Sequence, residues 1–216
     1  MCEGKNMNQK ERMQKTIQIL KPLHPQGTAL KFDSIFQLAI AVILSAQCTD
    51  TRVNIVTKEL FKKHKTPKDF VKLSQKDLEK IIYSTGFYRA KAKNIKGMAG
   101  LVHQKFKDKV PKTMEELLEL PGVARKTANI ILSEGYGIVE GIAVDTHVTR
   151  LSNRLGFTES KNPVMIEKDL MDLAPREEWW NLSNMLIWHG RKVCSARKPN
   201  CSECKLNSFC PSAFKV

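Results

Sequence analysis

The stretch from Leu120 to Asp145 constrains the fold more than any other part of this 216-residue chain. Within it, Pro121-Gly122 is a turn signal between two segments, 114–118 and 124–133, whose apolar residues recur at helical spacing. Two short helices joined by such a turn expose backbone N–H groups at the start of the second helix, where the helix dipole adds partial positive charge. The sequence therefore predicts a helix–hairpin–helix that can hold a phosphate group through its backbone.

Two side chains in this stretch are candidates for chemistry beside a bound phosphate. Lys126 falls near the start of the second helix, and Asp145 ends the Gly-containing connection that follows it. An amine is a nucleophile only when it is uncharged, and the N-terminal end of a helix disfavours the ammonium form. Asp145 could accept a proton or stabilise a developing positive charge. The simpler alternatives are a solvated surface lysine and a carboxylate that caps a helix over 146–155.

Four of the six cysteines lie together near the C-terminal end of the chain, with the spacing C-x6-C-x2-C-x5-C. They are Cys194, Cys201, Cys204 and Cys210. Four thiolates in one short segment can surround a metal centre, either a structural zinc ion or an iron–sulfur cluster. Disulfides are disfavoured because we expect an intracellular protein, whose thiols stay reduced. Cys2 and Cys48 are expected to be ordinary thiols.

The charge balance favours a polyanionic partner. The formal net charge is +14, and hydrophobic residues make up 42% of the chain, enough for a packed core. Nucleic acid is the first candidate and an anionic membrane surface the second. The polar N-terminal segment does not resemble a signal peptide, and the longest apolar run, 38–44, is far shorter than the roughly 20 residues that span a bilayer. We expect a monomer of prokaryotic type, without a targeting segment, in the cytoplasm and associated with the nucleoid.

Hydrophobic periodicity predicts an all-α fold, because no run of alternating polarity is long enough for a confident strand. Besides the hairpin, helices are predicted over 10–21, 34–47, 51–64, 88–106, 146–155, 164–173 and 178–193, with shorter ones beginning near 67 and 74. The helix over 34–47 is apolar nearly all round and belongs at the centre of a core. The helix over 88–106 is predicted to carry a basic face. That face would consist of Arg89, Lys91, Lys93 and Lys96.

Taken together, these segments resemble one known family. LPGVARKTAN followed by GIAVDTHVTR is similar to the helix–hairpin–helix and the aspartate-bearing loop of the endonuclease III family of base-excision DNA glycosylases. The resemblance continues through LSAQCTD, TGFYRAKAKNI, WHGRKVC and the last four cysteines, in the same order and over nearly the whole chain. It implies a six-helix domain over 28–138. It also implies a second domain, formed by 1–27 with 139–216, that holds a [4Fe–4S] cluster on the four cysteines, with DNA between the two domains.

The resemblance also implies an activity and roles for individual residues. The enzyme would remove oxidised pyrimidines from double-stranded DNA and cleave the abasic site by β-elimination. Lys126 would form a Schiff base with the sugar and Asp145 would assist. Gln47 would fill the gap left by the flipped nucleotide, and Phe87 would wedge into the opposite strand. The remaining residues expected at the DNA are Gly122, Ala124, Arg125, Thr127, Arg191, Arg197 and Lys198.

Alternatives remain at three points. Gln47 could be an ordinary helix-end residue and Phe87 a core aromatic residue. Ala124 stands where the family commonly has a second glycine, and we expect helical dihedral angles there, for which alanine is harmless. A monofunctional mismatch glycosylase acting on T or U opposite G would share the scaffold, but such relatives lack a lysine at the position of Lys126. A non-catalytic DNA-binding protein could use the hairpin only to hold phosphates.

Overall fold

The computed structural model describes residues 7–24 and 27–216, and no strand occurs among them. The predicted all-α fold is confirmed. The α-helices are α1 (Gln9–Leu20), α2 (Ile35–Ser45), α3 (Asp50–Lys63), α4 (Pro67–Lys72), α5 (Gln75–Ile82), α6 (Tyr88–Gln104), α7 (Met114–Leu118), α8 (Arg125–Ile130), α9 (Thr146–Arg154), α10 (Pro163–Leu173) and α11 (Trp179–Lys192). Short 3-10 turns occupy Lys21–Leu23, Tyr83–Thr85 and Arg176–Glu178, and a π-helix occupies Ile131–Tyr136.

Most helices begin at a residue whose side chain accepts a hydrogen bond from an N–H group of the first turn. This is why their starts lie close to those predicted. The capping residues include Ser34, Thr49, Thr66, Ser74 and Asp145. The helix predicted over 124–133 differs, because its α-helical part ends at Ile130 and the next turn is the π-helix.

Packing divides the chain into two units, residues 29–140 and residues 1–28 with 141–216. We call them the hairpin unit and the cysteine unit. The domain boundaries predicted from the sequence, after residues 27 and 138, stay a prediction. Cys2 lies outside the described residues.

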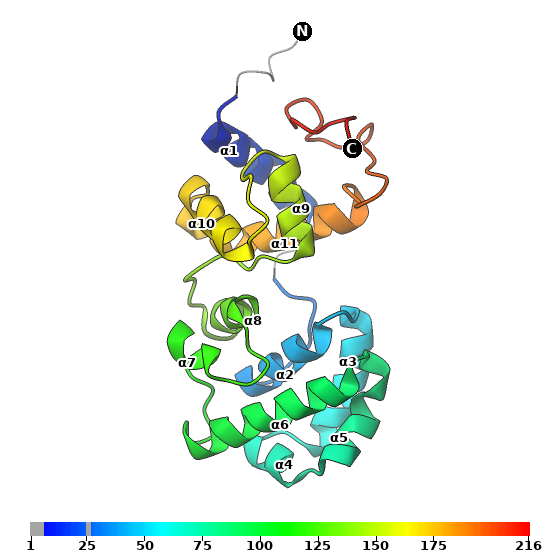
Figure 1. Cartoon of the computed structure of the whole chain (residues 1–216), viewed down its shortest axis with the longest axis vertical. Helices are drawn as coiled ribbons and strands as arrows, with labels where there is room; N and C mark the ends of the chain where they lie inside the picture. The colour runs from blue at the N-terminus through cyan, green and yellow to red at the C-terminus, as the bar shows by residue number, and fades with distance from the viewer. Residues whose placement is uncertain (1–6, 25–26) are drawn as a thin grey trace. The chain divides into compact units, whose positions relative to one another are not determined.

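The hairpin unit is built around α2, whose residues 36–44 are all buried. Helix α2 packs against α3, α6 and α8, and α6 also packs against α4 and α5 (Figure 1). A helix that is apolar on every side must lie inside a core, so the central position of α2 agrees with its sequence. Helix α6 runs along this core and buries Ala92, Ile95 and Met98.

The cysteine unit is assembled from both ends of the chain. Helix α1 packs against α10 and α11, and α9 packs against the same two helices (Figure 1). The core includes Met13 and Leu20 from the N-terminal segment beside Leu151, Leu170 and Leu182. Beyond α11, residues 193–216 form turns and bends without helix or strand in this described segment.

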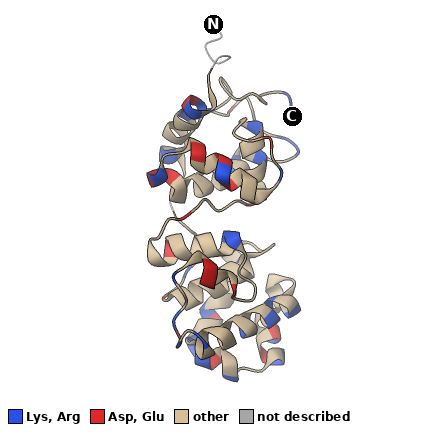
Figure 2. Cartoon of the chain, turned by 60° about the vertical axis from the view of Figure 1, so that its left-hand side comes forward, with Lys and Arg blue, Asp and Glu red and all other residues tan. Residues whose placement is uncertain are grey.

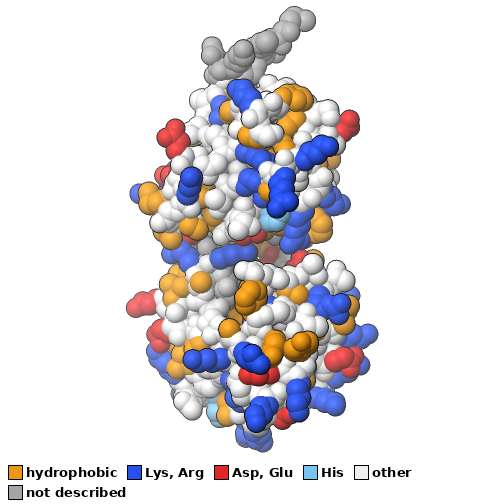
Figure 3. Space-filling model, turned by 45° about the vertical axis from the view of Figure 1, so that its right-hand side comes forward, with side chains coloured by type: hydrophobic (Ala, Val, Ile, Leu, Met, Phe, Trp, Pro, Cys, Tyr) orange, Lys and Arg blue, Asp and Glu red, His pale blue; other side chains and the backbone are white. Residues whose placement is uncertain are grey.

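Among the described helices, none combines the length and the apolar character needed to cross a bilayer. Lys and Arg residues occur along the ribbons of both units (Figure 2). On the face shown in Figure 3, basic side chains are spread over each unit and acidic ones are fewer, in keeping with the net charge of +14.

Candidate active site and metal centre

The turn of the hairpin depends on glycine at position 122. Gly122 has a φ of +81°, a left-handed conformation that side chains rarely adopt. A Cβ atom on Gly122 would also lie 2.8 Å from Cβ of Asn94 on α6. The N–H of Val123 donates to the carbonyl of Leu120 at 3.0 Å and closes the turn. Both the backbone conformation and the contact with α6 therefore exclude a side chain at Gly122.

Ala124 is the N-cap residue of α8, with φ −88° and ψ 171°. The expectation of helical dihedral angles was wrong, because the residue is extended. An extended backbone is open to any residue, so alanine in place of glycine is harmless here for a different reason. The methyl side chain of Ala124 cannot cap the helix, and this end of α8 has no side-chain cap hydrogen bond.

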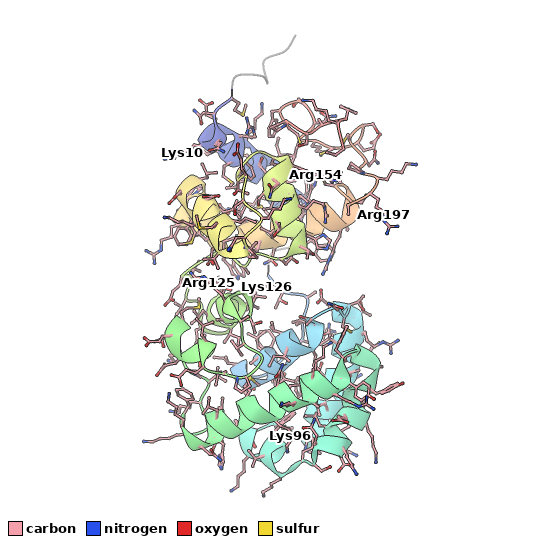
Figure 4. The ribbon with its side chains drawn as sticks, in the orientation of Figure 1. Lys10, Lys96, Arg125, Lys126, Arg154 and Arg197 are labelled. Carbon is pink, nitrogen blue, oxygen red and sulfur yellow. The ribbon has the colours of Figure 1, made fainter. Side chains whose placement is uncertain are left out.

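The candidate nucleophile lies in the first turn of α8. Lys126 is exposed, whereas its neighbours Arg125 and Thr127 are half-buried. Figure 4 shows Arg125 and Lys126 side by side on this helix. Lys126 is accessible to a macromolecular substrate, and an exposed position suits a solvated lysine equally well.

Asp145 does cap α9, as the simpler alternative proposed. Its Oδ1 atom accepts hydrogen bonds from the N–H groups of His147 at 2.8 Å and Val148 at 2.9 Å. The side chain is half-buried, and these two bonds fix its orientation. A cap and a catalytic carboxylate are compatible roles, because the cap holds the group in one position. Lys126 belongs to the hairpin unit and Asp145 to the cysteine unit.

The four clustered cysteines line one pocket in the segment that follows α11. None of the five described cysteines is in a disulfide. Burial raises the pKa of Cys204 and Cys210, and the neighbouring thiols, which are close enough to repel a second negative charge, raise it further. Four thiols that line one pocket, two of which resist ionisation as free groups, fit a metal centre, because metal ions compensate the charge of the thiolates.

The four cysteines could hold either a single ion or a cluster. Zinc held by four sulfurs at about 2.3 Å would bring those sulfurs to about 3.8 Å from one another. In the part of the chain that the structure describes, no group of three or more His, Cys, Asp or Glu side chains is arranged to hold one metal ion. An iron–sulfur cluster would instead give each of the four cysteines an iron of its own.

Groups that the sequence analysis did not select surround the cysteines. Nη1 of Arg154 donates to Sγ of Cys194 at 3.2 Å and to the carbonyl of Ser195 at 2.7 Å. Nη2 of Arg150 donates to the carbonyl oxygen of Cys194 at 3.0 Å. Nε2 of His189 lies 3.4 Å from Sγ of Cys204, and burial lowers the pKa of His189 to about 4. The four-residue spacing of Arg150 and Arg154 indicates that both lie on one face of α9. Only the folded chain shows what they contact.

The two residues expected to enter DNA both have left-handed backbones. Gln47 (φ +53°) occupies a turn in which the N–H of Cys48 donates to the carbonyl of Ser45 at 3.1 Å. With Ala46 at φ −57° and ψ 114°, this is a type II turn, whose third position normally takes glycine. Phe87 (φ +49°) precedes α6 and is 67% exposed. The alternative of a core aromatic residue at Phe87 is therefore wrong.

Both positions carry backbone strain, which they share with Lys107, Asp108 and Phe214. A left-handed conformation costs a residue with a side chain about 1–2 kcal/mol, and such strain collects at functional sites. The exposed Phe87 also leaves apolar surface in contact with water, which is unfavourable. Gln47 and Phe87 are thus held in place by the surrounding fold.

Comparison with known proteins agrees with this geometry. The family model for HhH-GPD superfamily base excision DNA repair proteins matches residues 40–176, and the model for the iron-sulfur binding domain of endonuclease III matches residues 194–210. Endonuclease III of Synechocystis sp. is 50% identical over 210 residues, which are 97% of this chain and 96% of that protein. The chain belongs to the endonuclease III family.

Other members are similar over most of their length. Endonuclease III of Bacillus subtilis is 47% identical over 181 residues, 83% of this chain and 82% of that protein. The structure of a non-covalent endonuclease III–DNA complex matches with a TM-score of 0.90 at 41% identity, covering 96% of this chain and 97% of that one. A trapped endonuclease III–DNA covalent intermediate matches at 0.89 and 42% identity, covering 96% and 98%. A thermostable thymine-DNA glycosylase, 21% identical with a TM-score of 0.84, shares the fold.

Membership of the endonuclease III family also identifies the metal centre. The matched iron–sulfur segment begins at Cys194 and ends at Cys210, the first and last of the four cysteines. The cofactor of the cysteine unit is a [4Fe–4S] cluster. The choice between zinc and a cluster, left open by the cysteine spacing alone, is thereby made.

Three of the basic residues expected at the DNA by analogy with the endonuclease III family belong to the segment that contains or precedes the four cysteines. Arg197 and Lys198 are exposed in the loop between the first two cysteines, and Figure 4 shows Arg197 extending outward from that loop. Arg191, near the end of α11, lies with its guanidinium carbon 5.7 Å from the centre of the Trp188 ring. These contacts place charges at the surface of the cysteine unit, and their role at DNA stays a prediction.

The predicted basic face of α6 needs a correction at one position. Arg89 and Lys93 are exposed and Lys96 is half-buried, but Lys91 is only 4% exposed. A step of two residues along a helix turns about 200°, so Lys91 points away from Arg89 and into the hairpin unit. Lys91 therefore belongs to the interior of the hairpin unit and not to its basic surface.

Proposed function

We propose that this chain is a bifunctional DNA glycosylase that removes oxidised pyrimidines from duplex DNA and cleaves the resulting abasic site by β-elimination. The observation that carries the proposal is the exposed Lys126 in the first turn of the hairpin helix, in a chain of the endonuclease III family. A solved relative at 42% identity is described as a trapped covalent intermediate with DNA. A covalent intermediate requires a nucleophile on the protein, and Lys126 is the candidate with chemistry and position in its favour.

The first half of the reaction replaces the base with the enzyme. The uncharged amine of Lys126 donates its electron pair to C1′ of a flipped nucleotide, and the C1′–N bond to the base breaks. The departing base takes up a proton. Loss of a proton from the lysine nitrogen and opening of the C1′–O4′ bond, with protonation of O4′, leave a Schiff base between Lys126 and the sugar.

The second half cleaves the strand. Removal of a proton from C2′ forms a double bond to C3′, and the C3′–O bond to the 3′ phosphate breaks with the phosphate as leaving group. Water then hydrolyses the imine and restores the amine of Lys126. No step needs an oxidant or a nucleotide cofactor.

We assign to Asp145 the stabilisation of positive charge on the sugar and the transfer of protons during these steps. The two N–H groups that bind its Oδ1 atom fix the direction of the carboxylate before DNA arrives. Preorganised charge of this kind contributes more than a mobile side chain would.

We assign the remaining residues to DNA binding. The N-terminal end of α8, with Gly122, Ala124, Arg125 and Thr127, would hold a phosphate, and Arg191, Arg197 and Lys198 would contact others. Gln47 would fill the space of the extruded nucleotide, and Phe87 would wedge between bases of the opposite strand. Cys194, Cys201, Cys204 and Cys210 would hold the cluster, which would fix the loop that carries Arg197. That the enzyme acts as a monomer on nucleoid DNA in the cytoplasm stays a prediction.

Borohydride reduction in the presence of abasic-site DNA tests the proposal. The native chain should form a covalent adduct, Lys126→Ala should form none, and the control Arg125→Ala should still form one, although it binds DNA more weakly. A full adduct with Lys126→Ala would refute the assignment. Release of a base without any adduct would favour a monofunctional mismatch glycosylase, and DNA binding without base release would favour a non-catalytic protein. A panel of lesions in defined duplexes would then establish the preferred base.

A further inference from the structure

Lys91 is a buried charge at the junction of three segments of the hairpin unit. Its Nζ atom donates to the carbonyl oxygens of Leu44 and Thr85, each at 2.8 Å. The first acceptor belongs to the last turn of α2 and the second to the 3-10 turn that precedes α6. Burial lowers the pKa of Lys91 and the neighbouring Cys48 acts in the opposite direction. A buried ammonium group is costly unless it is hydrogen-bonded, so these two bonds are what make the position tolerable.

The two acceptors lead directly into the residues proposed to enter DNA. Leu44 stands three positions before Gln47, and Thr85 stands two positions before Phe87. The backbone N–H of Lys91 also donates to the carbonyl of Phe87 at 3.1 Å. One residue of α6 thus bonds to the segment that bears Gln47 and, twice, to the segment that bears Phe87.

Left-handed residues keep their conformation only where their surroundings enforce it. The type II turn at Gln47 follows the C-terminal end of α2, and Phe87 follows the 3-10 turn at Thr85. Without the ammonium group, the carbonyl oxygens of Leu44 and Thr85 would be buried and lack this donor. The C-terminal end of α2 and the 3-10 turn at Thr85 would then be free to move until these oxygens meet water. The residues that follow them, Gln47 and Phe87, would move as well.

We propose that Lys91 is a positioning residue that holds Gln47 and Phe87 in one preformed arrangement for insertion into DNA. The inference rests on the proposed roles of those two side chains. If Gln47 and Phe87 are already ordered, binding of DNA with an extruded nucleotide does not have to restrict their conformational freedom, and the affinity is higher. Lys91 is buried and makes no proposed contact with DNA, so the affinity for undamaged duplex, which depends mainly on phosphate contacts, should not depend on Lys91.

The same helix provides a matched control. Nζ of Lys96 bonds to the carbonyl oxygens of Phe70, Val71 and Leu73 at the C-terminal end of α4. Like Lys91, it fastens a helix end to α6, but α4 bears none of the residues assigned to DNA. Figure 4 shows Lys96 on α6. Substitution of Lys96 therefore measures the general effect of removing hydrogen bonds between a lysine of α6 and the end of a neighbouring helix.

The experiment compares Lys91→Met and Lys96→Met, each alone and combined with Gln47→Ala or Phe87→Ala, in the full-length protein with its cluster. Affinity is measured for a duplex carrying a tetrahydrofuran abasic-site analogue and for the same duplex without it. Fluorescence of 2-aminopurine opposite the analogue reports insertion into the stack. Lys91→Met should weaken binding to the analogue duplex about tenfold, and should leave undamaged duplex within about twofold of the native affinity. The weakening should be smaller in each of the Gln47→Ala and Phe87→Ala backgrounds than in the native background, because each background removes one of the two side chains that Lys91 holds, and Lys96→Met should show none of it.

The outcomes separate this inference from the proposal on which it rests. If Gln47→Ala and Phe87→Ala themselves leave binding and fluorescence unchanged, their proposed roles fail and the role of Lys91 fails with them, while the borohydride adduct can still form. If those variants weaken binding but Lys91→Met is additive with them, or matches Lys96→Met, the inference alone is overturned. If Lys91→Met does not fold, Lys91→Arg, which keeps a charged donor of different length, is taken through the same cycles, and additivity there would equally overturn it.

Discussion

The two units hold their proposed functional residues by different physical means. In the hairpin unit, Gln47, Phe87 and Lys126 lie on turns and helix ends that are supported by apolar packing around α2 and by hydrogen bonds to α6. In the cysteine unit, the loop after α11 has no regular structure and is held by the cysteine centre and by Arg150 and Arg154. Packing among helices can position a side chain without a cofactor, whereas a long irregular loop requires cross-links.

The largest effect that would test this contrast is expected on removal of the cluster. Cys201→Ser, or iron chelation, should abolish the iron–sulfur absorbance and leave residues 193–216 unprotected in hydrogen exchange, because structural metal binding is also folding free energy. Residues 29–140 should keep their protection. The control Cys48→Ser should retain the cluster. Equal loss of protection in both units would mean that the hairpin unit depends on the cluster as well.

Substitution of Asp145 separates the capping role from the chemical one. Asp145→Asn keeps a good N-cap, so the free energy of unfolding should stay within about 0.5 kcal/mol, while Asp145→Ala should lose about 1 kcal/mol. Both should lower the rate of base release by roughly a hundredfold or more, because both lack the carboxylate. Rates are measured in single turnover on a lesion duplex, beside denaturant unfolding. An Asp145→Asn enzyme of native activity would reduce Asp145 to a helix cap.

The hairpin turn can be tested with two glycines of the same unit. Gly122→Ala forces a side chain into a left-handed residue and against Asn94, and should cost about 2 kcal/mol of stability. Gly100→Ala, on α6 with open space around the added methyl group, should stabilise by roughly 0.5–1 kcal/mol. Denaturant midpoints at constant slope measure both. A neutral Gly122→Ala would show that the turn can relax away from α6.

The smallest effect concerns a single charge of the cysteine unit. Contacts with about 4 phosphates predict a log–log slope of affinity against salt near −3.6, and Arg197→Ala should reduce its magnitude by about 0.9. Stability should not change, because Arg197 is exposed. Fluorescence anisotropy with undamaged duplex at several salt concentrations measures the slope. An unchanged slope would show that Arg197 does not contact a phosphate of the DNA.

Much of this molecule was predictable because its signals are local. Capping residues such as Ser34 and Thr49, apolar spacing and the Pro121-Gly122 turn determined the helices to within a few residues. The cysteine spacing determined that a metal centre exists. A helix or turn whose conformation depends on neighbouring residues can be predicted without knowing how distant parts of the chain pack. The same holds for metal ligands that lie in one short segment.

Only the tertiary structure decided what Lys91 and Arg154 do. The acceptor of Lys91 on α2 lies 47 positions away in the chain, and the sulfur that Arg154 meets lies 40 positions away. Nothing in its own segment distinguishes Lys91 from an ordinary basic residue on a helix, and the spacing of Arg154 from Arg150 does not show what Arg154 contacts. The role of such a charge becomes visible only when backbone and thiol groups from distant parts of the chain lie around it. Long-range packing brings those groups together, and the local sequence does not specify it.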